Sequence, residues 1–173
     1  PWRKQKEAYH IWISEIMLQQ TRIEAVKNYY NKFMEEIPTI EALANIEEGK
    51  LLKLWEGLGY YSRARNLKKA AQVMMENYQG NMPNTYEKLI ELPGIGEYTA
   101  GAIASIAYQE KVPAIDGNVL RVISRIIASK EDILFAKTKK VIEKKVTPII
   151  PKESGDFNEA LMELGELVCI PNG

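Results

Sequence analysis

The sequence lacks three features that would narrow its class at once: paired cysteines, an excess of charge of one sign, and a long apolar run. Cys169 is the single cysteine in 173 residues, so the chain forms no internal disulfide and cannot build a cysteine metal site by itself. Basic and acidic residues number 23 each, so bulk electrostatics do not indicate a polyanionic partner. The apolar runs end well short of the roughly 20 residues that cross a bilayer, and no secretory pattern opens the chain. We expect an intracellular protein without a membrane span.

Hydrophobic residues make up 46% of the chain, which suffices for one substantial core or for two small lobes that share an interface. Their spacing follows the helical period from end to end, and no segment shows the alternation typical of a half-buried strand. The sequence therefore predicts an all-α fold. Cap and stop residues place helices at about 8–37 with a break near 20–21, 39–43, 50–56, 62–75, 86–92, 97–108, 116–127, 138–146 and from 156 or 158 to 168.

Both ends of the chain have the character of cut ends. Position 1 is Pro rather than Met, and the last helical pattern stops directly after Cys169. We therefore expect a piece of a longer protein.

Glu15 lies on an apolar helix face, because Ile11, Trp12 and Leu18 are its neighbours one turn away. Surroundings poor in water raise the pKa of a carboxyl group and keep a proton available near neutral pH, as a general acid requires. A solvated helix glutamate is the alternative interpretation, and the pattern supports the two about equally. The polar residues 19–22 that follow suit base edges or phosphates, although a frayed helix end explains them as well.

A glycine-rich turn, 92–96, joins two of the expected helices. Gly94 and Gly96 permit backbone angles that present several N–H groups at the start of the second helix, where a phosphate can dock without any net basic charge. A plain helix-helix turn explains the turn taken alone. Asp116 follows twenty residues later and would ordinarily be only an N-cap. Together with a protonated carboxyl group, however, an ionised carboxylate is what glycosidic cleavage needs.

Two adjacent tyrosines, Tyr60 and Tyr61, follow a second glycine turn and precede Arg63. An exposed aromatic ring beside an arginine could wedge into a base stack that is opened by flipping, with the arginine on a flanking phosphate. The alternative is that both rings lie at the edge of the core.

In combination and in this order, these stretches resemble the helix-hairpin-helix DNA glycosylase superfamily, and most closely its MutY-type adenine glycosylases. The resemblance spans nearly the whole chain. The stretches that carry it are 1–3, 12–21, 55–67, 92–103, 114–119 and 157–162. It implies two helical lobes with the active site between them, one made of 1–21 and 126–173 and the other of 22–125, with the hairpin at about 86–108.

The resemblance also implies roles for individual residues. Glu15 corresponds to the general acid that protonates adenine at N7, Asp116 to the carboxylate that stabilises or covalently traps the sugar cation, and Asn118 to a residue that positions these groups. Tyr98 occupies the place where bifunctional relatives of the endonuclease III type carry a Schiff-base lysine. Since a tyrosine cannot form an imine, the resemblance implies a monofunctional glycosylase that leaves an abasic site.

The remaining site residues are implied more weakly. Arg3 and Glu159 correspond to residues that line the adenine pocket. The residues expected on the DNA, around the opposing 8-oxoguanine or at the backbone, are Gln19, Gln20, Thr21, Leu58, Tyr60, Arg63, Gly94 and Gly96. The implied partner is double-stranded DNA with A:8-oxoguanine or A:G mispairs, bound by a monomer that in a bacterium would lie in the cytoplasm with the nucleoid.

The sequence departs from the family in its cluster ligands. Members usually hold a four-iron four-sulfur cluster through four cysteines, and Cys169 resembles only the first. Either the chain is cut before the other three, which the abrupt end at Gly173 favours, or it is a member without the cluster; in both cases this chain cannot assemble the cluster alone. The family's C-terminal domain, which recognises 8-oxoguanine, is also missing, so discrimination for that lesion should be weak.

Three other functions fit parts of the sequence. A thymine mismatch glycosylase of the same superfamily shares the glycine hairpin and the aspartate, but an acid at Glu15 has no N7 to protonate in thymine. A non-catalytic DNA-binding module would use the hairpin alone. A helical scaffold of unrelated function would show no salt-dependent DNA binding.

Overall fold

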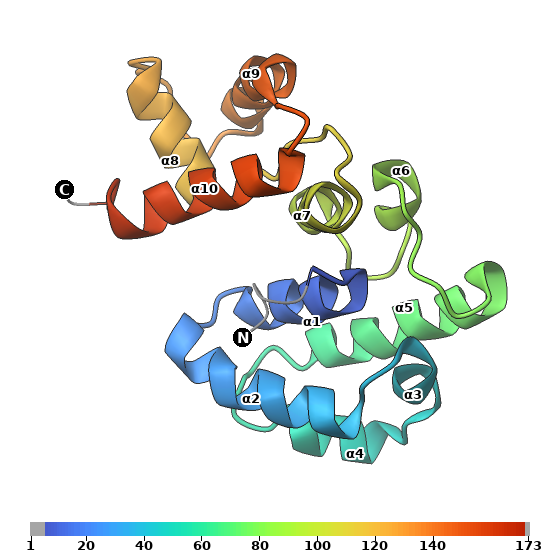
Figure 1. The fold of residues 1–173 in the computed structure, drawn as a ribbon. Helices are drawn as coiled ribbons and strands as arrows, with labels where there is room; N and C mark the ends of the chain where they lie inside the picture. Colours follow the sequence, from blue (N-terminus) through green and yellow to red (C-terminus); the bar gives the residue numbers. More distant parts are fainter. Residues whose placement is uncertain (1–5, 172–173) are drawn as a thin grey trace. The chain divides into compact units, whose positions relative to one another are not determined.

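The structure is a computed structural model that describes residues 6–171. In that part of the chain all regular structure is helical, which confirms the predicted all-α class (Figure 1). The helices are α1 Ala8–Leu18, α2 Ile23–Glu36, α3 Ile40–Asn45, α4 Glu48–Leu54, α5 Ser62–Tyr78, α6 Tyr86–Leu89, α7 Glu97–Tyr108, α8 Gly117–Ile126, α9 Ala136–Val146, the 3-10 helix η2 Thr147–Ile149 and α10 Ser154–Leu167. No helix in 6–171 combines the length and the apolar character that a membrane span requires.

The chain divides into two compact units, Pro1–Gly96 and Glu97–Gly173. These boundaries differ from those of the predicted lobes, because α1 packs against α2 and α5 within the first unit. The predicted grouping of residues 1–21 with 126–173 stays a prediction. The division falls at the end of the glycine turn, so that α6 and the turn belong to the first unit and α7 begins the second.

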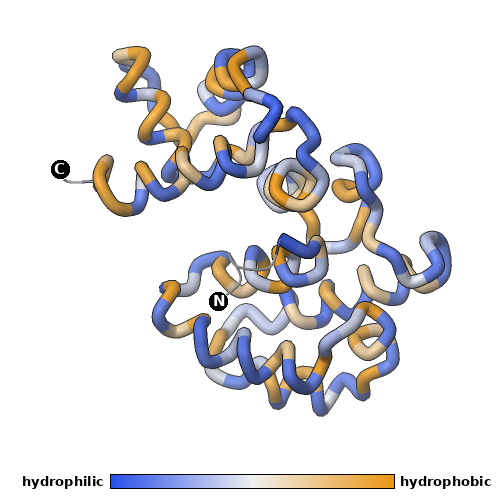
Figure 2. Tube along the Cα trace, viewed as in Figure 1, coloured by the Kyte–Doolittle hydropathy of each residue, from blue (hydrophilic) through white to orange (hydrophobic). Residues whose placement is uncertain are grey.

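The core of the first unit is built around aromatic and long apolar side chains. Trp12, Phe33 and Trp55 are fully buried, and the Phe33 and Trp55 rings meet edge to face with centroids 6.2 Å apart. Along the helices, hydrophobic and hydrophilic residues alternate, as expected for helices with one buried face (Figure 2).

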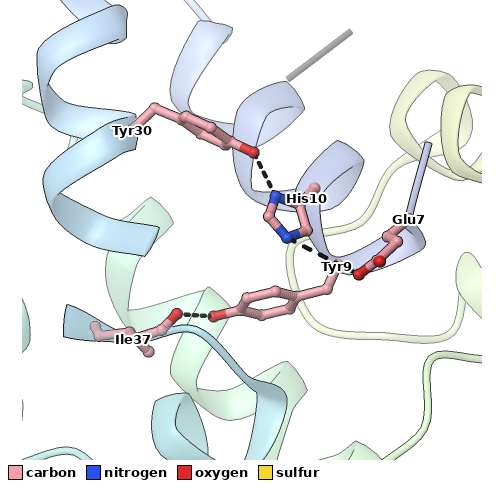
Figure 3. Close-up of polar contacts among 5 residues, drawn as sticks. All are labelled: Glu7, Tyr9, His10, Tyr30 and Ile37. Carbon is pink, nitrogen blue, oxygen red and sulfur yellow. Dashed lines mark hydrogen bonds and ion pairs between the residues drawn. The ribbon is translucent and has the colours of Figure 1, made fainter. Parts of the chain in front are cut away.

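Polar contacts fix α1 to α2 (Figure 3). The buried Tyr9 hydroxyl donates to the carbonyl oxygen of Ile37 at 2.8 Å, and His10 Nδ1 lies 2.7 Å from the Tyr30 hydroxyl. Burial, followed by the nearby Glu7 carboxylate, raises the pKa of Tyr30 to about 12. Both phenols therefore stay neutral donors or acceptors at physiological pH, and α1 is held in one position on its unit.

The second unit packs α8 between α9 and α10, and α7 against α10. Its apolar core consists of Ile115, Val119, Ile123, Ile142, Val146 and Ile150. Small residues on α7 allow a close approach of the chain: a Cβ on Gly101 would lie 2.2 Å from the Pro113 carbonyl oxygen. The segment that leads into α8 therefore runs directly over α7.

Several predicted helix ends are confirmed and others are wrong. The break near 20–21 exists, with Gln20 in the left-handed region at φ 56°. Thr39 caps α3 by accepting from Ala42 N at 3.1 Å. Ser62 is the first residue of α5 rather than its cap, because Tyr61 takes the N-cap position without a side-chain bond. Helix α10 begins at Ser154, before the predicted start.

Candidate active site

Glu15 lies near the middle of α1, as expected, on a face of low polarity. Ile11 is 5% exposed and Trp12 is fully buried, while Glu15 and Leu18 are partly buried. The carboxyl group thus stands beside apolar side chains but is not sealed from solvent.

Asp116 is the N-cap of α8, as the sequence predicts. Its Oδ1 accepts from Val119 N at 2.7 Å and its Oδ2 accepts from Asn118 Nδ2 at 2.9 Å. Burial raises the pKa of Asp116, although these hydrogen bonds and the charge of Arg121 act in the opposite direction. Burial has the larger effect on this pKa, and the hydrogen bonds at the helix start offset part of it.

Arg121, which sequence reasoning missed, holds Asn118 in turn. Its Nη2 donates to Asn118 Oδ1 at 2.7 Å and to the Gly165 carbonyl at 2.6 Å, and its Nε donates to the Cys169 carbonyl at 2.6 Å. Because the guanidinium occupies Asn118 Oδ1, the Nδ2 group is the one left to donate to Asp116. The only sequence signal was an arginine one turn after Asn118 on the same helix.

Asn158 on α10 was also missed as a site residue. It is fully buried, its Oδ1 accepts from Ala114 N at 3.2 Å, and its Nδ2 donates to the Val112 carbonyl at 2.9 Å. One carboxamide therefore satisfies two backbone groups of the segment that leads into Asp116. Glu159, the next residue, is partly buried on α10.

Tyr98 is the second residue of α7 and is partly buried. Its hydroxyl donates to Met162 Sδ at 3.2 Å, which places the ring against α10. A phenol at this position can donate or accept a hydrogen bond, but it has no amine with which to form an imine.

The glycine turn needs only one of its two glycines for its backbone shape. Gly94 has φ 77°, and a Cβ there would lie 2.7 Å from Asn66 Cβ. Gly96 has no positive φ, and a Cβ there would meet nothing within 4 Å. The expectation that both glycines permit special backbone angles is therefore correct for Gly94 and wrong for Gly96. Both residues are exposed just before α7.

The segments expected on the DNA in the first unit differ in exposure. Gln20 is exposed, and Gln19 and Thr21 are partly buried. Tyr60 is 62% exposed, whereas Leu58 is 6% exposed. The alternative of a core-edge position is therefore wrong for Tyr60, and Leu58, which we expected on the DNA, instead places its side chain in the core.

Arg63 does not present its guanidinium to solvent. The residue is 9% exposed, and both Nη atoms donate to groups of the chain itself. Burial lowers the pKa of Arg63. The predicted phosphate contact is thus not available to Arg63 in this arrangement.

Two cavities border these elements. One of about 50 Å³ is lined by Trp12, Gln19, Arg63 and Gly94 among others, and it has room for about one water molecule but not for a nucleobase. The other, of about 470 Å³, follows α9 and is lined by Ala136, Lys137, Lys140, Val141 and Lys144. None of the predicted site residues lines the second cavity.

Cys169 follows α10 and is partly buried, and its Sγ accepts from Arg125 Nη1 at 3.0 Å. No group of three or more His, Cys, Asp or Glu side chains gathers at a metal-binding distance in residues 6–171. A cluster that needs four thiolates therefore does not fit the residues of this chain. Arg3 lies outside the described residues.

Known proteins resemble this chain over most of its length. The model of the HhH-GPD superfamily of base excision DNA repair proteins matches residues 13–152. An adenine DNA glycosylase of Homo sapiens is 43% identical over 181 residues, 99% of this chain and 33% of that protein. One of Buchnera aphidicola subsp. Baizongia pistaciae is 40% identical over 171 residues, 98% of this chain and 48% of that protein. The chain thus spans about a third to a half of these relatives.

Solved structures show the same fold. A thermostable thymine-DNA glycosylase superposes with a TM-score of 0.90 at 29% identity, over 99% of this chain and 79% of that one. Endonuclease III in a non-covalent DNA complex superposes with a TM-score of 0.83 at 23% identity, over 98% of this chain and 78% of that one. The predicted glycosylase fold is confirmed. The chain belongs to the HhH-GPD superfamily of base excision DNA repair proteins.

Proposed function

We propose that this chain is the catalytic part of a MutY-type DNA glycosylase, which hydrolyses the N-glycosidic bond of adenine mispaired with 8-oxoguanine or guanine. The observation that carries the proposal is the hydrogen-bonded Asp116, whose two oxygens are fixed by Val119 N and Asn118. An oriented carboxylate of this kind suits a reaction in which positive charge develops on a sugar. The named adenine glycosylases that are similar over nearly all of this chain support the choice of base.

In the proposed reaction the adenine is flipped out of the duplex and Glu15 donates its proton to N7. The C1′–N9 bond then breaks, and its electron pair leaves with the neutral base. Asp116, ionised, stabilises the sugar cation until water adds to C1′ and loses a proton. This scheme requires that Glu15 of the first unit and Asp116 of the second face the same nucleotide, with Asn118 fixing the Asp116 carboxylate.

Tyr98 supports a monofunctional reaction, because the residue at this position offers a phenol rather than an amine. Hydrolysis then ends at an abasic site with the strand intact. We further propose that Arg3 and Glu159 line the adenine pocket.

The neutral composition of the chain is compatible with DNA binding through backbone groups. The exposed turn with Gly94 and Gly96 precedes α7, whose N-terminal N–H groups and dipole suit a phosphate. We propose that Gln19, Gln20, Thr21 and Tyr60 contact the strand opposite the adenine, in a duplex bound by a monomer, and that Leu58 supports them from the core. In this proposal, the iron-sulfur cluster and strong discrimination for 8-oxoguanine belong to a longer protein. In a bacterium, that protein would lie in the cytoplasm with the nucleoid.

A second candidate is thymine excision from T:G mispairs, which the superposition on a thymine-DNA glycosylase favours. Glu15 argues against it, since thymine offers no N7 for an acid to protonate. Salt-dependent duplex binding without base release would instead indicate a non-catalytic module.

The deciding experiment is single-turnover base release from A:8-oxoguanine, A:G and T:G duplexes, with Glu15→Gln and Asp116→Asn beside the unchanged protein. We expect adenine release that both substitutions abolish. Glu24→Gln is the matched control, because Glu24 is exposed on α2 and pairs with Lys27 at 2.7 Å. Release of thymine alone, or adenine release that survives both substitutions, would refute the proposal.

A further inference from the structure

Arg63, the second residue of α5, places its guanidinium against the end of α1. Its Nη1 donates to the carbonyl oxygens of Ile16 at 2.8 Å, Met17 at 3.0 Å and Gln19 at 2.6 Å. The last carbonyls of a helix have no partner within the helix and carry its partial negative charge. A buried cation at this point therefore both satisfies these oxygens and holds the chain as it leaves α1.

The other terminal nitrogen of Arg63 reaches a second turn. Nη2 donates to the carbonyl oxygens of Leu58 at 3.1 Å and Gly59 at 3.2 Å, and it lies 3.4 Å from Thr21 Oγ1. One side chain thus joins residues 19–21 to residues 57–60, two segments far apart in the sequence. We name these segments the first and second opposite-strand turns.

Each of these turns contains a non-glycine residue in a strained backbone conformation. Gln20 has φ 56° and Tyr60 has φ 47°. Such left-handed residues cost on the order of 1 kcal/mol or more each and persist only where their surroundings fix them. The Arg63 guanidinium carbon also lies 5.7 Å from the ring centroid of the exposed Tyr60 and 5.4 Å from that of the buried Trp55. The bonds of Arg63 are the fixing contacts that both turns share.

We propose that Arg63 is a positioning residue, which holds both opposite-strand turns in the shape that recognises the nucleotide facing the adenine. It acts from inside the protein, through Gln20 and Tyr60, rather than by touching a phosphate. This inference rests on the proposed function, since that function assigns the two turns to the opposite strand. Turns that are already ordered lose less entropy on binding, so the benefit appears as affinity for the mispair.

Lysine keeps the charge of Arg63 but loses the planar fork, and one ammonium group with three donors cannot serve all six acceptors. We expect Arg63→Lys to lower the ratio of A:G to A:T duplex affinity by about tenfold, because freeing one strained turn is worth on the order of 1.4 kcal/mol. The single-turnover rate at saturating A:G duplex should change by less than about threefold, since Arg63 does not touch the reacting atoms. A role in folding alone would lower the active fraction and leave the affinity ratio of the active molecules unchanged.

Arg65→Lys is the matched control, being the same substitution two residues along α5. Arg65 is exposed and pairs with Glu48 at 2.8 Å, so its replacement should leave the affinity ratio unchanged. A folded Arg63→Lys variant with an unchanged ratio would overturn the proposal for Arg63 while adenine release still upholds the glycosylase. No base release by the unchanged protein would instead remove the proposed function.

A measurement on the unsubstituted chain decides the matter if Arg63→Lys does not fold. Guanidinium ¹⁵N NMR should show two distinct, slowly rotating Nη groups for Arg63, and their signals should stay in place when duplex DNA is added. Rapidly averaged Nη signals, or a shift on binding DNA as at a phosphate contact, would refute an internal positioning role.

Discussion

Gly165 lets α10 lie directly against Asn118, and replacing it with alanine tests whether Asn118 fixes Asp116. The new Cβ would lie 2.6 Å from Asn118 Cβ and 3.0 Å from the Asn118 backbone. Carbon atoms in contact stay ~3.5–4.0 Å apart, so α8 and α10 must separate by about 1 Å. A shift of that size would break the 2.6 Å hydrogen bond from Arg121 Nη2 to the Gly165 carbonyl, and Arg121 is the group that orients Asn118 toward Asp116.

We expect two separate effects of Gly165→Ala. Overpacking should lower the free energy of unfolding by about 1–3 kcal/mol, as measured by urea denaturation. Misplacing the Asp116 carboxylate should also lower the single-turnover rate of adenine release by about 10- to 100-fold per folded molecule. The rate is measured with active-site titration, so that loss of folded protein does not count as loss of chemistry.

Gly80→Ala is the control, because it strains the protein outside α10. Gly80 has φ 76°, and a Cβ there would lie 3.1 Å from Met75 Sδ. Its stability loss should be similar, but its rate per folded molecule should stay near that of the unchanged protein. Equal rates for the two folded variants would show that Asn118 does not set the position of Asp116, and our account of the site would be wrong.

Three further predictions concern charge, the glycine turn and the abasic product. Burial raises the pKa of Asp116 and Arg121 opposes that rise, so the acid limb of the single-turnover pH–rate profile should lie above the ordinary aspartate pKa of about 3.9. Arg121→Met should move this limb to higher pH, and a limb that stays in place would exclude an effect of Arg121 on the pKa of Asp116. Gly94→Ala should lower the unfolding free energy by about 1–3 kcal/mol, since its φ is 77°. Gly96→Ala should keep the fold and weaken duplex binding. Equal melting temperatures of the two variants would contradict our conclusion that only Gly94 is needed for the backbone shape of the turn. Tyr98→Lys should gain borohydride trapping on DNA, and equal trapping by the unchanged protein would refute a monofunctional enzyme.

The extent of the helices could largely be predicted from the sequence, because local signals determine it. Helix α7 follows the glycine turn and ends at Tyr108 as predicted, and Asp116 caps α8 through its own side chain. Helix α10 begins early for a tertiary reason. Gly155 packs on α7 and its N–H donates to Gln109 Oε1 at 3.3 Å, a contact that no local pattern announces.

The partners of the arginines could not be predicted. Arg63 stands beside an exposed tyrosine, which suggested a phosphate, but its acceptors include carbonyls more than 40 residues earlier in the chain. Arg121 likewise bonds the Gly165 and Cys169 carbonyls from far along the sequence. Residue type and spacing identified the candidate catalytic carboxylates, whereas the groups that orient them depend on which backbone oxygens the packing leaves without donors.

The Asn158 carboxamide has a consequence for how the protein fails on heating. The hydrogen bonds that hold Val112 and Ala114 to α10 both come from this one side chain, whereas a strand in a sheet is held by a row of backbone hydrogen bonds. Once α10 loosens, both of these anchors vanish together while α7 and α8 can remain coiled. Enzymatic competence is therefore expected to disappear some degrees before the helical signal does, which makes thermal inactivation a local event.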